Sequence, residues 1–520
     1  MRVQACCLIL AALVAMPLHA KPADGPRQRC EALADGPLPE GVSIKSAKLL
    51  EAKQDMPEAC QVRGSIHGRS RFELRLPTTQ WNGRYHMTGC GGFCGQVDVS
   101  GSYYREGLKR GYATITTDNG HRGLHVGVAR WAEGNTEARI DFGWRAVHDT
   151  ARTGKALTTT YYGRDIQRSY FSGCSSGGRQ GLMEASRYPE DFDAVFVESP
   201  AQDVLGLVLM MTAALQADTG VDGKPIFDGA KLPLVVAGAA KACGDAMGRI
   251  DHPQDCRFDP VVLQCASGGD EATCLSPAEV GVVRRWYAGA PKSDQYPSSG
   301  GAPYGSEPFW VLRGEAPWWL DLMWRTQSER PLKEPMLTQK GVSEGMLRYL
   351  LSDPSLGGDY DPAKFDLQRD IPLIRRWALE MTPSADLSAF RARKGKLVIV
   401  QSLGDFMVPP ASNLDYFARL QKALGGAKKA ADTARMFLAP GMGHCVNGPG
   451  ELPGYDLGDY EALSALERWV EQGQAPAFLP ATKRDAGGKL LRAEPLCAVP
   501  TQAFHSGKGD HLDMANWSCR

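Results

Sequence analysis

The sequence predicts an α/β fold that is interrupted by one large insertion. Strand and helix signals alternate over residues 21–202 and again over 386–520, which we assign to a single catalytic domain. Between them, over 203–385, hydrophobic periodicity weakens while Gly, Pro, Cys and Trp become frequent. We therefore expect this segment to form an inserted lid domain that is held by its own disulfides.

The N-terminus has the features of a secretory signal. Arg2 precedes an apolar run over 7–16, and the small residue Ala20 stands before the polar residues that begin at Lys21. The run is too short to span a bilayer, which takes about 20 apolar residues. The sequence predicts a signal peptide over 1–20, a periplasmic or secreted mature protein, and no membrane partner.

The charges of the chain balance. The 59 Lys and Arg residues equal the 59 Asp and Glu residues, so no overall field favours nucleic acid or an anionic membrane. We therefore expect the partner to be a small molecule bound in a pocket, and no nucleic acid.

Alternating and β-branched runs predict strands, and helical periodicity predicts helices, on both sides of the insertion. A strand over 168–172 runs into a glycine turn, and the helix over 178–188 that follows is ended by Pro189. The other predicted strands cover 72–77, 112–117, 396–400 and 435–439, and the other helices cover 142–162, 414–424 and 462–471.

Ser175 lies in the turn Gly-Cys-Ser-Ser-Gly at 173–177, between a predicted strand and a predicted helix. A strand, a tight glycine turn and a helix are the context of a nucleophile elbow. Ser343 stands in a second Gly-x-Ser-x-Gly match at 341–345, but no strand precedes it. We expect Ser343 to cap a helix and Ser175 to be the nucleophile.

A serine nucleophile needs a base to take its proton and a carboxylate to orient that base. Asp405 follows the first predicted strand after the insertion, and His444 follows the next one through Pro-Gly-Met-Gly. Their order after Ser175 is that of an α/β hydrolase. Asp415 is the alternative acid, but a helix face would carry it into solvent. The other histidines lack this position and are expected at the surface or hydrogen-bonded in the core.

Two backbone amides are needed to stabilise a tetrahedral intermediate. One is expected from Ser176, directly after the nucleophile. The other is expected from Gly91 or Gly92, within the glycine-rich segment 89–95. An ordinary glycine-rich turn is the alternative for that segment.

The 14 cysteines leave 12 once the signal is removed, and an even number in an exported protein predicts disulfides and not metal or redox chemistry. Cys174 adjoins Ser175 and Cys445 adjoins His444, which predicts a bond between the two that ties the nucleophile to the base. Proximity in the sequence predicts the other pairs: Cys30 with Cys60, Cys90 with Cys94, Cys243 with Cys256, Cys265 with Cys274, and Cys497 with Cys519.

Several segments together resemble one known family. The segments at 173–180 (Gly-Cys-Ser-Ser-Gly-Gly-Arg-Gln), 404–409 and 440–445 are similar to motifs of the tannase and feruloyl esterase family of α/β hydrolases. That family includes hydrolases of monohydroxyethyl terephthalate. The resemblance implies the α/β-hydrolase fold with an inserted lid over the aromatic part of the substrate, and Ser and His loops joined by a disulfide. Further matching stretches lie at 81–84, 141–148, 187–193 and 469–473.

The resemblance also implies a function. It is that of a secreted serine esterase, which hydrolyses carboxylic esters of (hydroxy)aromatic acids, of the feruloyl, galloyl or terephthalate type, through an acyl-enzyme on Ser175. A general carboxylesterase or a peptidase of the same fold is one alternative. A binding protein on a hydrolase scaffold is another, against which the complete set of Ser175, Asp405 and His444 argues.

Members of the family hold calcium in an Asp-rich loop of the lid, just after a cysteine. The corresponding segment here, 243–256, is several residues short, and Asp245 and Asp251 are the candidate oxygen ligands that remain. Calcium takes six to eight oxygens, more than this loop offers. No cofactor is expected for catalysis, and structural calcium stays open.

The lid segment is rich in aromatic residues, which suit planar acyl groups. Trp310 and Trp319 lie in its densest aromatic run and are the first candidates to contact substrate, with core packing as the alternative. Arg313 and Arg325 lie in the same run and are weaker candidates to meet a phenolate or a carboxylate.

Overall fold

The structure is a computed structural model. It describes residues 25–123, 128–245, 248–291, 300–310, 337–445, 461–485 and 487–520. The predicted signal peptide, Trp319, Arg313 and Arg325 therefore lie outside the described residues.

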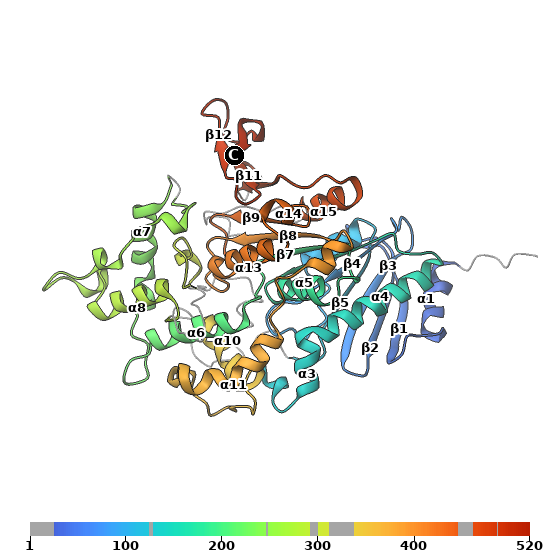
Figure 1. The fold of residues 1–520 in the computed structure, drawn as a ribbon, viewed down its shortest axis with the longest axis horizontal. Helices are drawn as coiled ribbons and strands as arrows, with labels where there is room; N and C mark the ends of the chain where they lie inside the picture. The colour runs from blue at the N-terminus through green and yellow to red at the C-terminus, as the bar shows by residue number, and fades with distance from the viewer. Residues whose placement is uncertain are drawn as a thin grey trace, which may run out of the picture.

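A nine-stranded sheet forms the centre of the molecule (Figure 1). Its strands in chain order are β1 (Val42–Leu50), β2 (Ala59–Ile66), β3 (Ser70–Pro77), β4 (Arg84–Thr88), β5 (Ala113–Thr117), β6 (Arg168–Cys174), β7 (Ala194–Glu198), β8 (Lys396–Ser402) and β9 (Ala434–Ala439).

The sheet is antiparallel at one edge and parallel elsewhere. Its order is β1-β2-β3-β5-β4-β6-β7-β8-β9, in which β1, β2, β3 and β5 pair antiparallel with their neighbours in turn. From β5 to β9 every neighbouring pair is parallel. The turns that follow β6, β7, β8 and β9 therefore meet at one edge of the sheet.

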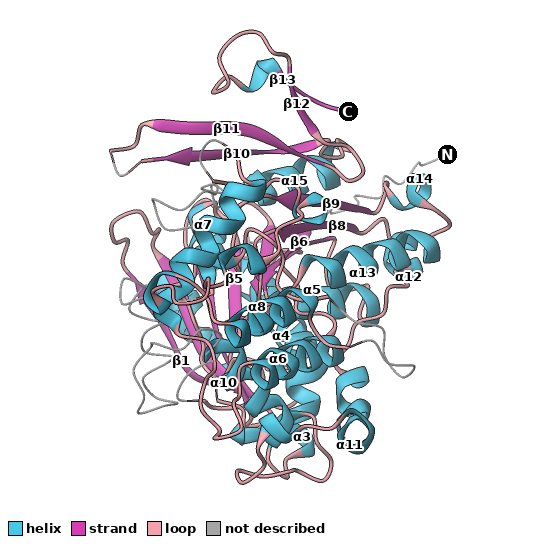
Figure 2. Cartoon of the chain, turned by 90° about the vertical axis from the view of Figure 1, so that its left-hand side faces the viewer, coloured by secondary structure: helices cyan, strands magenta, loops and turns pink. Residues whose placement is uncertain are grey.

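Each face of the sheet buries a separate core, because successive side chains of a strand point to opposite faces. On β6, Phe171 lies in a cluster with α4, α5 and α13, whereas Tyr170 lies in a cluster with α15 and a C-terminal strand pair. Figure 2 shows that pair, β10 and β11, lying alongside the edge of the sheet at β9. These elements are α4 (Ala146–Tyr162), α5 (Ser176–Arg187), α13 (Pro410–Ala423), α15 (Glu461–Gln472), β10 (Phe478–Arg484) and β11 (Leu490–Cys497).

The described part of the insertion between β7 and β8 is mainly helical. Part of it buries a core of its own around Trp286, beside but separate from the two sheet cores. The predicted limits of the lid, 203 and 385, fall at the start of α6 and after α11, and the division into domains stays a prediction. The longer helices of the insertion are α6 (Val204–Ala217), α7 (Leu232–Cys243), α8 (Pro277–Ala288), α10 (Leu337–Gly345) and α11 (Leu367–Glu380).

The remaining described α-helices and β-strands lie around this framework. They are α1 (Pro26–Asp35), α2 (Ser102–Lys109), α3 (Thr136–Ile140), α12 (Ser388–Ala392), α14 (Ala427–Ala430), β12 (Ala503–His505) and β13 (Trp517–Cys519).

The predicted strands and helices are present with small shifts of their ends, but one local prediction is wrong. Ser343 does not cap a helix: it is 0% exposed and lies inside α10, which begins at Leu337. Gly345, the last glycine of this match, allows close packing and does not form a turn, since a Cβ there would lie 2.8 Å from the ring of Phe93.

All six predicted disulfides are present in the structure. Five of them close short or moderate loops, whereas the bond between Cys174 and Cys445 spans a sequence separation of 271 residues. It joins the end of β6 to the loop after β9, two places that no other covalent link brings together.

Candidate active site

Ser175 occupies the sharp turn between β6 and α5. Its φ of 58° and ψ of −123° are a conformation that residues with a side chain rarely adopt. The turn is tight, because a Cβ at Gly173 would lie 2.6 Å from the carbonyl carbon of Gly177. The sequence therefore needs glycine beside the serine, and the strained turn presents the hydroxyl at the end of the strand.

The three predicted catalytic side chains form one hydrogen-bonded chain. The Oγ of Ser175 lies 2.9 Å from the Nε2 of His444, and the Nδ1 of the same ring lies 2.8 Å from an oxygen of Asp405. Asp405 is 0% exposed, and its other oxygen accepts hydrogen bonds from the amides of Met407 and Val408, each at 2.9 Å. A carboxylate fixed in this way can orient the imidazole as a base for the serine.

The alternative acid, Asp415, lies elsewhere. It is on α13, and its side chain, 67% exposed, pairs with Arg419 at 2.8 Å. The pair is an ordinary surface contact between residues one helical turn apart.

The environment of His444 favours its protonated form. Burial lowers the pKa of the imidazole, but the charge and hydrogen bond of Asp405 outweigh it, and the charge of Glu198 adds to them. The result is a pKa above the ordinary 6.5. An imidazole with a raised pKa accepts a proton from serine more readily and is stabilised once it carries the proton.

Glu198 is a second buried carboxylate near the site, which the sequence prediction missed. It ends β7, its carbonyl accepts the Ser175 amide at 3.0 Å, and its carboxylate accepts a hydrogen bond from Tyr103 at 2.6 Å. An acidic residue at the carboxyl end of a buried strand, 194–198, was the available signal.

The glycine loop, which we define as residues 89–95, lies against the start of α5. Among the described hydrogen bonds, none uses the backbone amides of Gly91, Gly92 or Ser176 as donors. A Cβ at Gly91 would meet no described atom within 4 Å. The amides predicted for the oxyanion are thus available, and space remains beside one of them.

The insertion reaches the catalytic loops. Phe309 packs against the loops of both Asp405 and His444: a Cβ on the neighbouring glycines, Gly404 and Gly443, would lie 3.2 and 2.6 Å from its ring. A side chain at either glycine would push this contact apart. The insertion and the two loops are therefore fitted to each other.

Trp310 is not placed to contact a substrate. It is 2% exposed, its indole donates to Ser306 at 2.8 Å, and its ring lies 5.3 Å from each of Trp286 and Tyr287. The aromatic run that suggested a pocket instead supplies the core of the insertion here. Trp319 remains a prediction, because it lies outside the described residues.

The two candidate calcium ligands are already neutralised by protein cations. The guanidinium of Arg249, a residue 4% exposed, bonds Asp251 at 2.9 Å and Glu494 at 2.6 Å. Asp245 lies 2.9 Å from Arg492 and 3.9 Å from the same Arg249. Oxygens shared among two guanidinium groups do not fit a calcium site, which needs six to eight free oxygens. The structure therefore does not support the predicted metal role.

Among the described residues, no helix combines the length and apolar character that a membrane crossing requires.

The sheet order and the geometry around Ser175 define the class of this protein, which has the α/β-hydrolase fold. A family model described as tannase and feruloyl esterase matches residues 58–520. The chain belongs to this family and is a carboxylic ester hydrolase.

Relatives match almost end to end. The mono(2-hydroxyethyl) terephthalate hydrolase of Piscinibacter sakaiensis is 30% identical, over 95% of this chain and 92% of the relative. Feruloyl esterase B of Aspergillus niger is 27% identical, over 97% and 98%. Among solved structures, feruloyl esterase B from Aspergillus oryzae has a TM-score of 0.80 at 23% identity, covering 95% of this chain and 100% of that one. At that identity the structural likeness supports the fold alone.

Removing the bond between Cys174 and Cys445 should impair turnover more than stability. By loop entropy, this bond stabilises the fold by at most about 5 kcal/mol, but it also holds the Ser and His loops in register. We expect the double change to serine to lower kcat strongly while the melting temperature falls only modestly, so that loss of folded protein does not account for the loss of turnover. The double change of Cys265 and Cys274, a bond within the insertion, is the matched control and should leave kcat intact. Equal kcat in the two variants would contradict the expectation.

The pH profile should report the charge of Glu198. His444 must be neutral to act as a base, so kcat/KM should rise with pH through its raised pKa, above 6.5. Glu198→Gln removes a negative charge, lowers that pKa and should move the acid limb to lower pH. Glu307→Gln is the control, because Glu307 is another buried carboxyl, whose pKa burial raises to about 7, but its charge does not contribute to the shift of His444. An unmoved limb in Glu198→Gln would refute this role.

Calcium removal should leave the fold unchanged, whereas loss of Arg249 should not. A chelator is expected to leave the melting temperature of the wild type as it was. Arg249→Met leaves the buried carboxylate of Glu494 without its cation and should cost about 3 kcal/mol of unfolding free energy, measured in urea. Arg284→Met is the control: its pair with Asp259 is 50% exposed on both sides, so less than about 1 kcal/mol is expected. A chelator that lowers the wild-type melting temperature would disprove this account.

Proposed function

We propose that this chain is an exported serine esterase that hydrolyses carboxylic esters of (hydroxy)aromatic acids through an acyl-enzyme on Ser175. The observation that carries the proposal is the hydrogen-bonded chain from Ser175 through His444 to Asp405, at 2.9 and 2.8 Å. Membership of the tannase and feruloyl esterase family supports the ester substrate.

The first half of the reaction forms the acyl-enzyme. His444 takes the proton of Ser175 Oγ as the oxygen attacks the ester carbonyl carbon, and Asp405 stabilises the imidazolium that forms. The amides of Ser176 and of Gly91 or Gly92 hold the negative oxygen of the tetrahedral intermediate. As this intermediate collapses, the alcohol leaves with the proton from His444.

The second half releases the acid. Water takes the place of the alcohol, His444 removes its proton, and the hydroxide attacks the acyl carbon. A second tetrahedral intermediate collapses, the bond to Ser175 breaks, and the serine oxygen regains its proton from His444. The same two amide positions serve both intermediates, so these amides stabilise a negative oxygen twice in each turnover.

The names of the relatives favour an aromatic acid. One is a hydrolase of mono(2-hydroxyethyl) terephthalate and another is a feruloyl esterase, and both align over nearly their whole length. The insertion packs on the Asp405 and His444 loops through Phe309, which supports a role in selecting the acid, and we propose that 203–385 acts as a lid. Export is supported by six disulfides and the signal-like N-terminus.

Ser175→Ala should abolish ester hydrolysis without unfolding the protein. The loss should be at least about 10⁴-fold in kcat, measured with p-nitrophenyl acetate, and near-UV circular dichroism should be unchanged. A fluorophosphonate should label the wild type and not the variant, which separates an esterase from a binding protein. Retained turnover in the variant would contradict the assignment of Ser175 as the nucleophile.

A substrate panel tests the acid. Methyl ferulate, methyl gallate and mono(2-hydroxyethyl) terephthalate are compared with methyl esters of aliphatic acids and with peptides. We expect kcat/KM for at least one aromatic ester to exceed that of the aliphatic esters by about tenfold or more. Faster hydrolysis of the aliphatic esters would favour a general carboxylesterase, and cleavage of peptides would favour a peptidase.

A further inference from the structure

Gln180 joins the helix that follows the proposed nucleophile to the glycine loop. It lies one turn along α5 from Ser176 and is 2% exposed. Its Oε1 accepts a hydrogen bond from the Cys90 amide at 3.1 Å, and its Nε2 lies 3.3 Å from the sulfur atoms of Cys90 and of Cys94. Both polar ends of one buried side chain therefore act on the same loop.

The loop and the helix are also in direct backbone contact at this place. A Cβ at Gly89 would lie 2.6 Å from the Cα of Gly177 and 2.7 Å from the Oε1 of Gln180. The Gly89 amide donates to the carbonyl of Ser172, at the end of β6, at 2.9 Å. The entrance of the loop is thus fixed to the strand and helix that flank Ser175.

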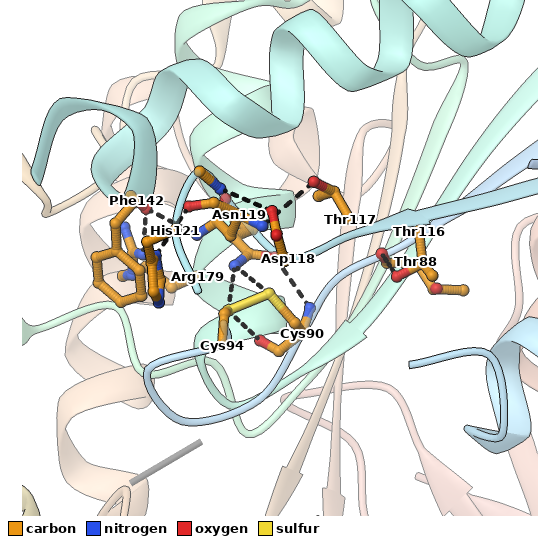
Figure 3. The surroundings of a disulfide bond; sticks show 12 residues. Thr88, Cys90, Cys94, Thr116, Thr117, Asp118, Asn119, His121, Phe142 and Arg179 are labelled. Atoms are coloured by element: carbon orange, nitrogen blue, oxygen red, sulfur yellow. Dashed lines mark hydrogen bonds between the residues drawn. A yellow bond between two sulfur atoms is a disulfide. The ribbon is translucent and has the colours of Figure 1, made fainter. Parts of the chain in front are cut away.

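The exit of the loop is fixed by different groups. The amide of Gly95 donates to the carbonyl of Asp118 at 3.0 Å, and Arg71 donates to the carbonyl of Gly95 at 3.2 Å. Figure 3 shows the disulfide between Cys90 and Cys94 lying close to Asp118, the residue that follows β5. Between entrance and exit, the amides of Gly91 and Gly92 make no described hydrogen bond to the protein.

We infer that Gln180 is a positioning residue for the oxyanion donors. Its amide sets the distance between the glycine loop and Ser175, and so places Gly91 or Gly92 where the charge of the tetrahedral intermediate develops. The disulfide of Cys90 and Cys94 gives the loop a fixed shape, and Gln180 fixes that shape to the helix. The inference rests on the proposed function, because it concerns the donors of that reaction.

The effect belongs to the transition state and not to substrate binding. Oxyanion donors act only at hydrogen-bond distance from the oxygen that becomes charged, so a small displacement of the loop weakens them. Without Gln180 the buried amide of Cys90 has no partner, and the loop must move to find one. The substrate in its ground state does not depend on these donors to the same degree, so KM should change little.

The test compares two buried glutamines. Gln180→Met keeps most of the volume and removes the hydrogen bonds, and Gln61→Met is the matched control, because Gln61 is also 2% exposed but lies on β2 and bonds Glu73. We expect Gln180→Met to lower kcat by about 100-fold, as for the loss of one oxyanion donor, with KM within about twofold. Benzeneboronic acid, which forms a tetrahedral anion on serine, should bind more weakly by a similar factor.

The control should retain kcat and boronate affinity. A kcat of Gln180→Met within about threefold of Gln61→Met, or an unchanged boronate affinity, would overturn the inference. If Gln180→Met does not fold, Gln180→Asn replaces it: its side chain is one methylene shorter and cannot reach the Cys90 amide, so kcat should again fall by about 100-fold at constant KM, whereas wild-type kcat would overturn the inference. Loss of turnover in Ser175→Ala tests the proposed function separately.

Discussion

The parallel pairing of β6, β7, β8 and β9 is the constraint on which the site depends. Because these strands run in one direction, their carboxyl ends reach the same edge of the sheet, and each is followed there by a residue of the site or its surroundings. The insertion interrupts the chain between two of these strands without disturbing their pairing. The sheet can therefore accommodate a large insertion between β7 and β8 while the arrangement of residues at its carboxyl edge is kept.

The parts of the site that depend on local chain order were predictable from the sequence. Ser175, Asp405 and His444 each follow a recognisable strand through a turn, and the cysteine pairs are mostly near neighbours. The contacts of Gln180 and Arg249 were not predictable in this way, because their partners lie far away in the sequence. Glu198 had a local signal at the end of its strand, but its effect on His444 depends on a distant residue. Trp310 and the second Gly-x-Ser-x-Gly match at Ser343 misled for a related reason. A residue type or a short motif does not say whether a side chain fills a core or lines a pocket, and both of these side chains are buried.

Arg249 of the insertion pairs with carboxylates that include both candidate calcium ligands, Asp245 and Asp251. The guanidinium of Arg249 bonds Asp251 in the insertion and Glu494 on β11. A guanidinium is directional and offers its donors in a plane, so it bonds a few oxygens in fixed positions. The loop between Cys243 and Cys256 is thereby joined to the C-terminal part of the chain by charge as well as closed by its own disulfide.

The bond between Cys174 and Cys445 gives the molecule a covalent ring that contains the whole insertion. If a protease cut the chain once within that ring, the product would be two polypeptides that remain linked beside the serine and the histidine. The disulfide is thus a second covalent link, besides the peptide backbone of the insertion, between the chain before the insertion and the chain after it. The bond thus lets the chain tolerate a cut in the insertion, and it lets that segment change in length during evolution without separating the loops of Ser175 and His444.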